Sequence, residues 1–177
     1  VNFMLGCLQE LSASLAGRGL ALQWRLGEPV EAVVQAAREL KADVVYWNRD
    51  YEPGAIERDR LVQQRLGKLG VAVRTFKDHV VFEASEVRGV SGEPLQRYSA
   101  YRARWWTQWH ATVPAVQPIP TTLAKKNAAL LPIARPLPTA GELGYDAVRP
   151  WIEPGERNAQ KRLHWFVEEP IHSYAQG

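Results

Sequence analysis

The alternation of helical and extended patterns over residues 29–76 restricts most strongly how this chain can fold. Apolar side chains recur at helical spacing in residues 29–40 and 52–69, and each of these segments is followed by a short apolar run, at 43–47 and 71–76. Connections of only a few residues between such elements are typical of crossover units, in which helices cover parallel strands. The pattern therefore predicts an α/β fold.

The preceding residues extend the same pattern. Residues 3–15 place apolar side chains on one helical face, and the alternating run at residues 20–26 predicts another strand. Pro29 suits the first position of the next helix, and Gly70 suits the end of the helix at 52–69. We therefore expect a Rossmann-like parallel sheet with flanking helices.

Ligands of parallel sheets bind beyond the carboxyl ends of the strands. In this sequence the predicted strands are followed by residues 27–29, 48–50 and 77–79. We expect these three loops to share one edge of the sheet.

Residues 114–154 contain eight prolines and few periodic runs, which is typical of an extended linker. Residues 156–174 again look helical. The predicted organisation is an α/β domain at 1–113, a linker at 114–154, and the start of a second domain at 155–177.

Composition limits the class of protein. With 46% hydrophobic and 23% charged residues the chain is typical of globular proteins, and no apolar run is long enough for a membrane-spanning helix. The single cysteine, Cys7, cannot form an internal disulfide, and no secretion signal is recognisable. We expect a cytoplasmic protein without a membrane role.

The net charge of +3 is too small to establish binding to a polyanion, but residues 95–141 contain no Asp or Glu. Within this stretch, residues 97–106 interleave arginines with Tyr and Trp, a composition used to hold phosphates and stack bases. Aromatic residues at helical spacing more often pack a core with arginine stems at its rim. From composition, packing is therefore the expected role of these residues, with contact to a nucleic acid as the alternative.

The residue patterns alone do not identify a reaction. The cysteine and the four histidines lack metal-ligand spacing, so no metal site is expected, and the GxSxG, GxGxxG and GxxxxGK[ST] patterns are absent. His79 is an acid–base candidate, although a structural hydrogen bond is the commoner use of such a histidine. Asp50 and Glu52 could accept hydrogen bonds from a ligand or cap the next helix.

Three blocks carry a family resemblance. Residues 48–53 read N-R-D-Y-E-P, Arg58-Asp59 follows, and residues 76–83 read F-K-D-H-V-V-F-E. Together they resemble the photolyase and cryptochrome family, in which an N-R-D-Y-E-P segment and R-D precede F-K-D-H. Residues 91–101 and 155–166 are also similar to the family, the second range to the start of its helical domain.

The resemblance implies a light-driven DNA repair enzyme, a carbon–carbon lyase. Family members have an N-terminal antenna domain, a long linker, and a helical domain that binds FAD. The excited reduced flavin donates an electron to a cyclobutane pyrimidine dimer flipped out of the duplex, and the ring splits. Damaged DNA would bind through the helical domain of a monomeric complete protein.

Site residues follow from the resemblance. The antenna cavity is implied at Asn48, Arg49, Asp50 and Glu52, with Lys77 and Asp78 as further candidates. Tyr174 matches the tyrosine that begins the flavin-binding region. None of these residues is expected to be catalytic. Folate-binding members resemble Y-E-V-N-E-R where this chain has Y-E-P-G-A, which favours FMN or a deazaflavin as the antenna, or an empty site.

The resemblance also implies that two central strands precede residue 1 and that the flavin-phosphate segment follows residue 177. On that basis we expect these residues alone to be poorly stable and inactive in repair. Two alternatives stay open: a cryptochrome-type blue-light photoreceptor, and a non-catalytic α/β module that binds a nucleotide or a flavin.

Overall fold

The computed structural model describes residues 1–112 and 136–174. Contacts divide the chain into two units. One is Leu26–Ile119, and the other combines Val1–Arg25 with Pro120–Gly177.

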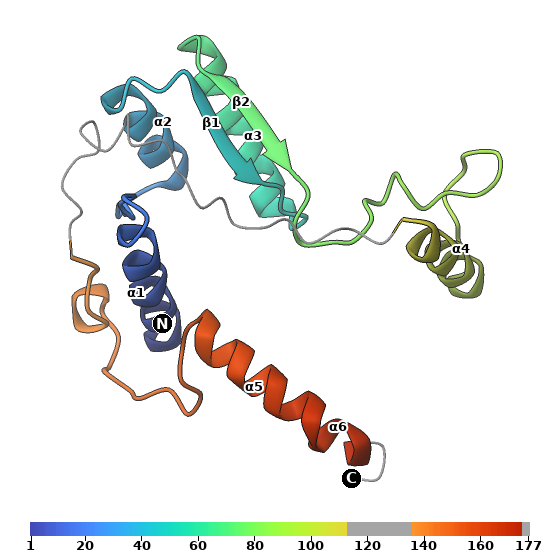
Figure 1. Cartoon of the computed structure of the whole chain (residues 1–177). Coiled ribbons are helices and arrows are strands. Elements are labelled where there is room, and N and C mark those ends of the chain that lie inside the picture. The colour runs from blue at the N-terminus through green and yellow to red at the C-terminus, as the bar shows by residue number, and fades with distance from the viewer. Residues whose placement is uncertain (113–135, 175–177) are drawn as a thin grey trace. The chain divides into compact units, whose positions relative to one another are not determined.

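The unit Leu26–Ile119 contains a two-stranded parallel sheet with helices against it (Figure 1). The strands pair in register from Val44↔Ala72 to Asn48↔Phe76. Its elements in chain order are α2 (Pro29–Glu39), β1 (Val44–Asn48), α3 (Pro53–Lys68), β2 (Ala72–Phe76) and α4 (Tyr98–Ala111). The predicted α/β class with a parallel sheet and flanking helices is confirmed.

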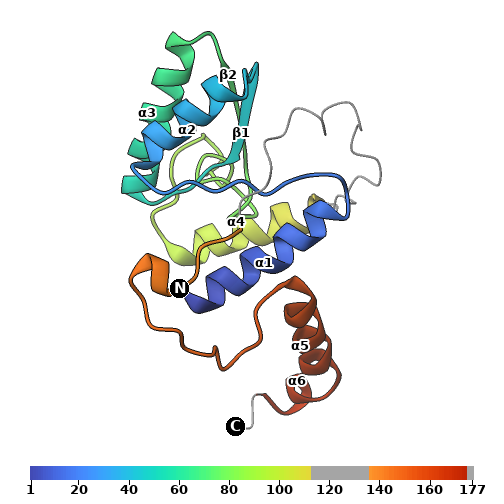
Figure 2. The ribbon, with the colours of Figure 1, turned by 90° about the vertical axis from the view of Figure 1, so that its left-hand side faces the viewer.

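The core of this unit lies between α2, α3 and one face of the sheet, and Figure 2 shows both helices beside β1 and β2. Alternate strand residues point to the same face, so Val45, Trp47 and Val73 pack together against the helices. Leu66 of α3 is fully buried. The buried helix residues of the cluster are Val30, Val34, Ala37, Val62 and Leu66.

The opposite face of the two strands carries an exposed aromatic pair. Tyr46 is 63% exposed and Phe76 is 52% exposed. Their rings stack with centroids 6.1 Å apart and planes 17° apart. Among the described residues of this unit, α2 and α3 therefore cover one face of the sheet, and the other face presents this aromatic pair.

Helix starts and ends follow local sequence signals. Pro29 opens α2, where the Glu28 side chain accepts a hydrogen bond of 2.9 Å from the backbone N–H of Glu31. Pro53 likewise occupies the first position of α3, but without a side-chain cap. Gly70 follows α3 with φ +75°, a conformation that glycine adopts without strain. These predicted boundaries are confirmed.

The aromatic side chains of α4 pack mainly on one another. Trp105 stacks on Trp109 at 5.6 Å and meets Phe82 edge-on at 5.5 Å. Gln108 donates a hydrogen bond of 2.7 Å to the carbonyl of Glu86 and so ties the helix to the preceding loop. No residue of α4 is fully buried, and its arginines are exposed.

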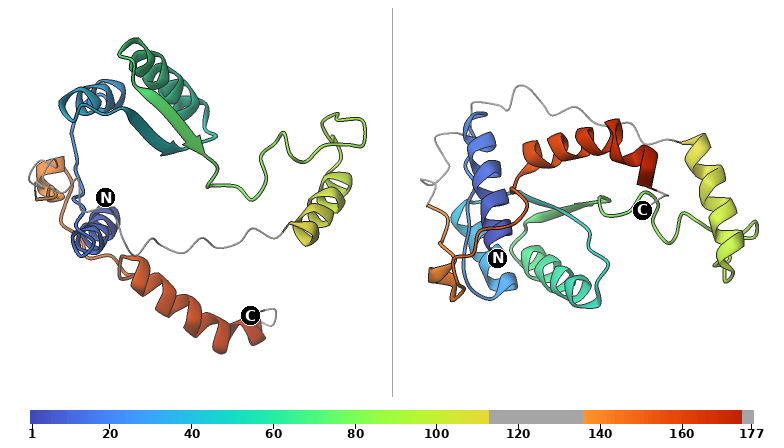
Figure 3. Two further views of the ribbon diagram at one scale, coloured as in Figure 1. Left: turned by 45° about the horizontal axis from the view of Figure 1, so that its top comes forward. Right: turned by 90° about the horizontal axis from the view of Figure 1, so that it is seen from below.

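The second unit contains α1 (Asn2–Ala16), the short 3-10 helix η2 (Gly141–Leu143), α5 (Glu156–Glu168) and α6 (Pro170–Ser173). Figure 3 shows α5 leading into α6 near the carboxyl terminus. Near its start, α1 is tied to the described part of the proline-rich segment, because Asn2 donates a hydrogen bond of 2.8 Å to the carbonyl of Asp146.

Two predicted elements are wrong. Residues 20–26 form no strand, because no described strand pairs with them, and the Trp24 indole instead donates a hydrogen bond to the carbonyl of Pro136 at 2.9 Å. Residues 27–29 therefore do not follow a strand. The helix expected at 156–174 is interrupted at Glu169 (φ −125°, ψ −66°), since Pro170 disfavours helical geometry in the preceding residue.

The linker expected at 114–154 falls partly outside the described residues. Its described part, 136–154, is irregular apart from η2, which Thr139 and Glu142 brace by reciprocal hydrogen bonds. Among the described helices, none combines the length and the apolar character needed to cross a membrane.

Candidate functional site

The polar segments that follow β1 and β2 meet at one edge of the sheet, as expected for parallel strands. The side-chain amide of Asn48 donates a hydrogen bond of 3.0 Å to Oδ2 of Asp78. The backbone N–H of Arg49 donates to the carbonyl of Phe76 at 2.8 Å, which continues the ladder one residue past the strand. The structure therefore brings residues 48–50 and 77–78 together, while residues 27–29 lie at the start of α2.

The guanidinium of Arg49 hydrogen-bonds to other residues of the protein. Nη1 donates to both the carbonyl and the hydroxyl oxygen of Thr75, at 3.1 Å each. Nε and Nη2 donate to Oε1 of Glu83 at 3.2 and 2.9 Å. The side chain thus ties the end of β1 to β2 and to the loop after it.

Glu83 receives a second donor. The hydroxyl of Tyr51 and then the Arg49 guanidinium hold the pKa of Glu83 below its usual value. Burial, followed by the hydrogen bond to Glu83, raises the pKa of Tyr51. The same ion pair raises the pKa of Arg49. Tyr51 and Glu83 belong to the sequence blocks at residues 48–53 and 76–83, but only their spatial contact distinguishes them as part of the site.

Asp50 forms the turn that leads into α3. Its Oδ1 accepts hydrogen bonds from the backbone N–H groups of Tyr51 (2.7 Å) and Glu52 (3.3 Å). These backbone donors lower the pKa of Asp50, with smaller contributions from the charges of His79 and Arg58. The carboxylate is therefore ionised at neutral pH, and Oδ2 makes no hydrogen bond within the described residues.

Glu52 has no capping hydrogen bond although it stands at the N-cap of α3, and its side chain is exposed. Lys77 is engaged elsewhere: Nζ lies 2.8 Å from Oε2 of Glu86 and 5.7 Å from the centre of the Phe82 ring. The hydrogen bond from Lys77 holds the pKa of Glu86 below its usual value.

These contacts divide the predicted antenna residues by chemistry. Arg49 and Lys77 hold the loop at 77–86 in place, whereas Asn48, Asp50 and Glu52 present oxygens that can accept hydrogen bonds from a ligand. Within residues 1–112 and 136–174, no group of three or more His, Cys, Asp or Glu side chains has the geometry of a metal site. The edge can bind and orient a donor-rich molecule.

Tyr174, the residue predicted to contact FAD, lies in the other unit. It follows α6, is 74% exposed, and meets Phe166 of α5 edge-on at 5.9 Å. Phe166 therefore holds the ring of Tyr174 beside α5 while most of its surface stays accessible.

Comparisons with known proteins identify the family to which this chain belongs. The model of the DNA photolyase family matches residues 1–121. A 31.6 kDa protein from Synechococcus sp. (strain PCC 6716), described as uncharacterized, is 34% identical over 99% of this chain and 61% of its own length. A deoxyribodipyrimidine photo-lyase from Synechococcus sp. (strain ATCC 27144 / PCC 6301 / SAUG 1402/1) is 33% identical over 98% of this chain and 37% of its own length.

The fold agrees with these sequence matches. The solved structure of a Synechocystis sp. PCC6803 cryptochrome superposes with a TM-score of 0.73 at 16% identity, covering 99% of this chain and 37% of that one. The chain thus spans about three fifths of the first relative and little more than a third of the photo-lyase. From the family model and the shared architecture, we conclude that this chain belongs to the DNA photolyase family.

Proposed function

We propose that these residues are the antenna-bearing segment of a flavin-dependent DNA photolyase. The observation that carries the proposal is the match of the DNA photolyase family model to residues 1–121. The name of the second relative, deoxyribodipyrimidine photo-lyase, indicates the reaction: light-driven cleavage of a cyclobutane pyrimidine dimer in DNA. FAD supplies the electron in such enzymes, and the protein orients the flavin and the flipped lesion.

The experiment is a repair assay on the protein encoded by the complete reading frame. An oligonucleotide with one thymine dimer is incubated with the reduced protein under blue light or in the dark. We expect loss of the dimer in the light only. Flavin binding without repair would instead favour the cryptochrome-type photoreceptor, whose fold this chain shares. Binding of a nucleotide with neither FAD binding nor repair would favour the non-catalytic binding module.

We further propose that Asn48, Asp50 and Glu52 bind the antenna chromophore, and that Lys77 and Asp78 shape the same edge. Three features support this: the free Oδ2 of Asp50, the exposed carboxylate of Glu52, and the contact between Asn48 and Asp78. A flavin-type ring and its hydroxylated chain offer N–H and O–H donors to such oxygens. FMN or a deazaflavin is the expected antenna rather than folate, because residues 51–55 depart from the Y-E-V-N-E-R pattern that folate-binding members resemble.

The antenna proposal is tested by extracting the chromophores of the complete protein. Asp50→Asn should lower the ratio of second chromophore to FAD. The substitution removes the negative charge and replaces one carboxylate oxygen, which can accept a hydrogen bond from the ligand, by an NH2 group that can only donate. Asp43→Asn is the matched control, since Asp43 precedes the opposite end of β1. An unchanged ratio in Asp50→Asn would remove Asp50 from the site.

The remaining parts of the proposal concern organisation. We assign residues 1–113 to the antenna domain, 114–154 to the linker and 155–177 to the start of the helical FAD-binding domain, with Tyr174 at the flavin. Damaged DNA would be bound through the helical domain of a monomeric, cytoplasmic protein.

A further inference from the structure

One face of α1 is lined by small and polar residues that contact the segment leading into α5. Asn2, Gly6 and Glu10 recur at intervals of four, so they lie above one another on the helix. Asn2 binds the carbonyl of Asp146, as described above. Gly6 and Glu10 meet residues 154–157, and all of these residues belong to one unit.

Gly6 allows Pro154 to approach the helix backbone closely. A Cβ at position 6 would lie 2.8 Å from Cβ of Pro154 and closer still to its Cγ. Real Cβ atoms do not approach other carbons to that distance, so any side chain at position 6 would push Pro154 away from α1.

Glu10 reaches the first turn of α5, where a capping side chain is missing. The N-cap of α5 is Gly155, which has φ +104° and offers no side chain. Oε1 of Glu10 accepts hydrogen bonds from the backbone N–H of Arg157, at 3.3 Å, and from its Nε, at 2.8 Å. The backbone bond is the one that a capping residue ordinarily makes to the second residue of a helix.

The second carboxylate oxygen fills the space beside Gly155. A Cβ at position 155 would lie 2.6 Å from Cδ of Glu10 and closer still to Oε2. Oε2 is buried and has no hydrogen-bond partner among the described residues. The hydrogen bond from Arg157 nevertheless keeps the pKa of Glu10 below its usual value, although burial opposes it. A negative charge at this point also interacts favourably with the positive end of the α5 dipole.

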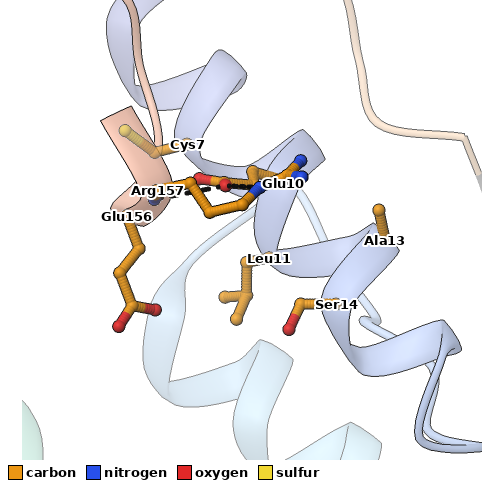
Figure 4. Close-up of a pocket in the computed structure, with 7 residues that line it drawn as sticks. All are labelled: Cys7, Glu10, Leu11, Ala13, Ser14, Glu156 and Arg157. Atoms are coloured by element: carbon orange, nitrogen blue, oxygen red, sulfur yellow. Dashed lines mark hydrogen bonds and ion pairs between the residues drawn. The ribbon is translucent and has the colours of Figure 1, made fainter. Parts of the chain in front are cut away.

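A cavity of about 540 Å³ adjoins this contact, and the native thiol of Cys7 lines it beside Glu10 and Arg157 (Figure 4). Cys7 is the single cysteine of the chain and is partly buried. The reactivity of its thiol can therefore report whether the start of α5 stays packed on α1.

We propose that Glu10 is a positioning residue that caps α5 from α1 and fixes the start of α5 there, with Gly6 and Gly155 providing the space for the contact. Glu10 thereby orients the helix that leads to Tyr174. Only this consequence for a flavin rests on the proposed function, because the docking itself involves residues of this chain alone.

The test measures the rate at which Cys7 reacts with a disulfide reagent under native conditions in the protein encoded by the complete reading frame, followed by mass spectrometry of the peptide that contains Cys7. Glu10→Gln and Arg157→Gln should each raise the rate by about two- to tenfold, the range expected when one hydrogen bond is removed from a local opening equilibrium. The double variant should react no faster than the faster single variant, since both changes break the same contact. Unchanged rates in both single variants, or additive effects in the double variant, would overturn the proposal.

Gly6→Ala provides an independent variant with a matched control. It should also raise the rate, because the added methyl group displaces Pro154. Gly67→Ala places the same methyl group on α3, where no atom lies within 4 Å, and should leave the rate unchanged. If Glu10→Gln lowers the helical circular dichroism of the whole chain, Arg157→Gln decides the outcome, because that side chain is 82% exposed. A complete protein that fails to repair DNA would leave these rates unaffected.

Discussion

A single guanidinium at the end of β1 holds three segments together. Arg49 donates to Thr75 on β2 and to Glu83 on the following loop, while its own N–H pairs with Phe76. An arginine used in this way has few of its five donors left for a ligand, so in the proposed antenna site its main role would be to position its neighbours. In the proposed antenna site, the acceptors of Asn48, Asp50 and Glu52 would therefore carry the binding chemistry.

Arg49→Gln should raise the pKa of Glu83 toward the ordinary value of 4.5 but not fully, because the Tyr51 hydroxyl still donates to Glu83. A carboxyl whose folded-state pKa is lowered contributes stability above its unfolded pKa, and that contribution is lost as the pH falls through the folded value. Unfolding free energy should therefore fall less steeply below about pH 4.5 in the variant than in the wild type. NMR titration of the Glu83 carboxyl and denaturant unfolding at several pH values check both statements.

Glu142 is the control for this titration. Its pKa is lowered by the backbone and side chain of Thr139, in the other unit, and should not respond to Arg49→Gln. An unchanged pKa of Glu83 in the variant would show that the ion pair does not persist in solution.

At the scale of elements, α3 is held by its buried stripe. Leu66 is fully buried among Val30, Val34, Ala37 and Val62. Its position on α3 follows from helical periodicity, which places every third or fourth residue on the sheet-facing side. The stripe thus fixes which face of α3 meets the strands.

Leu66→Ala should destabilise the chain by about 2–5 kcal/mol, because it removes buried methyl groups and leaves a cavity. Chemical denaturation of the variant and the wild type measures the difference. Leu69→Ala is the matched substitution at the end of the same helix, where the side chain is 37% exposed and the loss should be smaller. Equal losses would mean that α3 is not seated as described.

The break between α5 and α6 also belongs to this scale. Pro170→Ala restores a backbone N–H and removes the ring, so residues 156–173 should become one continuous helix. Backbone chemical shifts of Glu169 would move to helical values. Pro29→Ala is the control, since proline at the first position of α2 interrupts nothing. If Glu169 stays non-helical in Pro170→Ala, the break is caused by contacts of α6 and not by the proline.

At the scale of the whole molecule, the sheet has a face that no described helix of its own unit covers. Tyr46 and Phe76 together form an exposed aromatic patch there, and such patches favour association. The double variant Tyr46→Ser, Phe76→Thr should therefore raise the concentration at which the 177-residue chain begins to associate.

Light scattering over a concentration series measures this onset. Tyr145→Ser is the control, because Tyr145 is similarly exposed at 57% but belongs to the other unit. If the double variant and the control associate at the same concentration, the patch does not drive association.

The sequence by itself determined α1, α2, α3 and most of α5, the two described strands, their parallel order and the family. Periodicity, Pro29, Pro53 and Gly70 act over a few residues, so these features are readable from neighbouring positions. The same local reasoning failed at residues 20–26, because an alternating pattern becomes a strand only where a partner strand is available. It also extended α5 through Pro170, although the proline itself carried the signal for a break.

Only the tertiary structure decided which of the predicted site residues bond to other parts of the protein and which keep their acceptors exposed. The partner of Arg49 lies 34 positions away, and the partner of Glu10 lies 147 positions away. Pairings at such separations depend on the path of the whole chain and leave no periodic signal in the sequence. The division between the positioning residues Arg49, Lys77 and Glu10 and the free acceptors of Asn48, Asp50 and Glu52 therefore arises from packing, since it is packing that supplies each side chain with its partner.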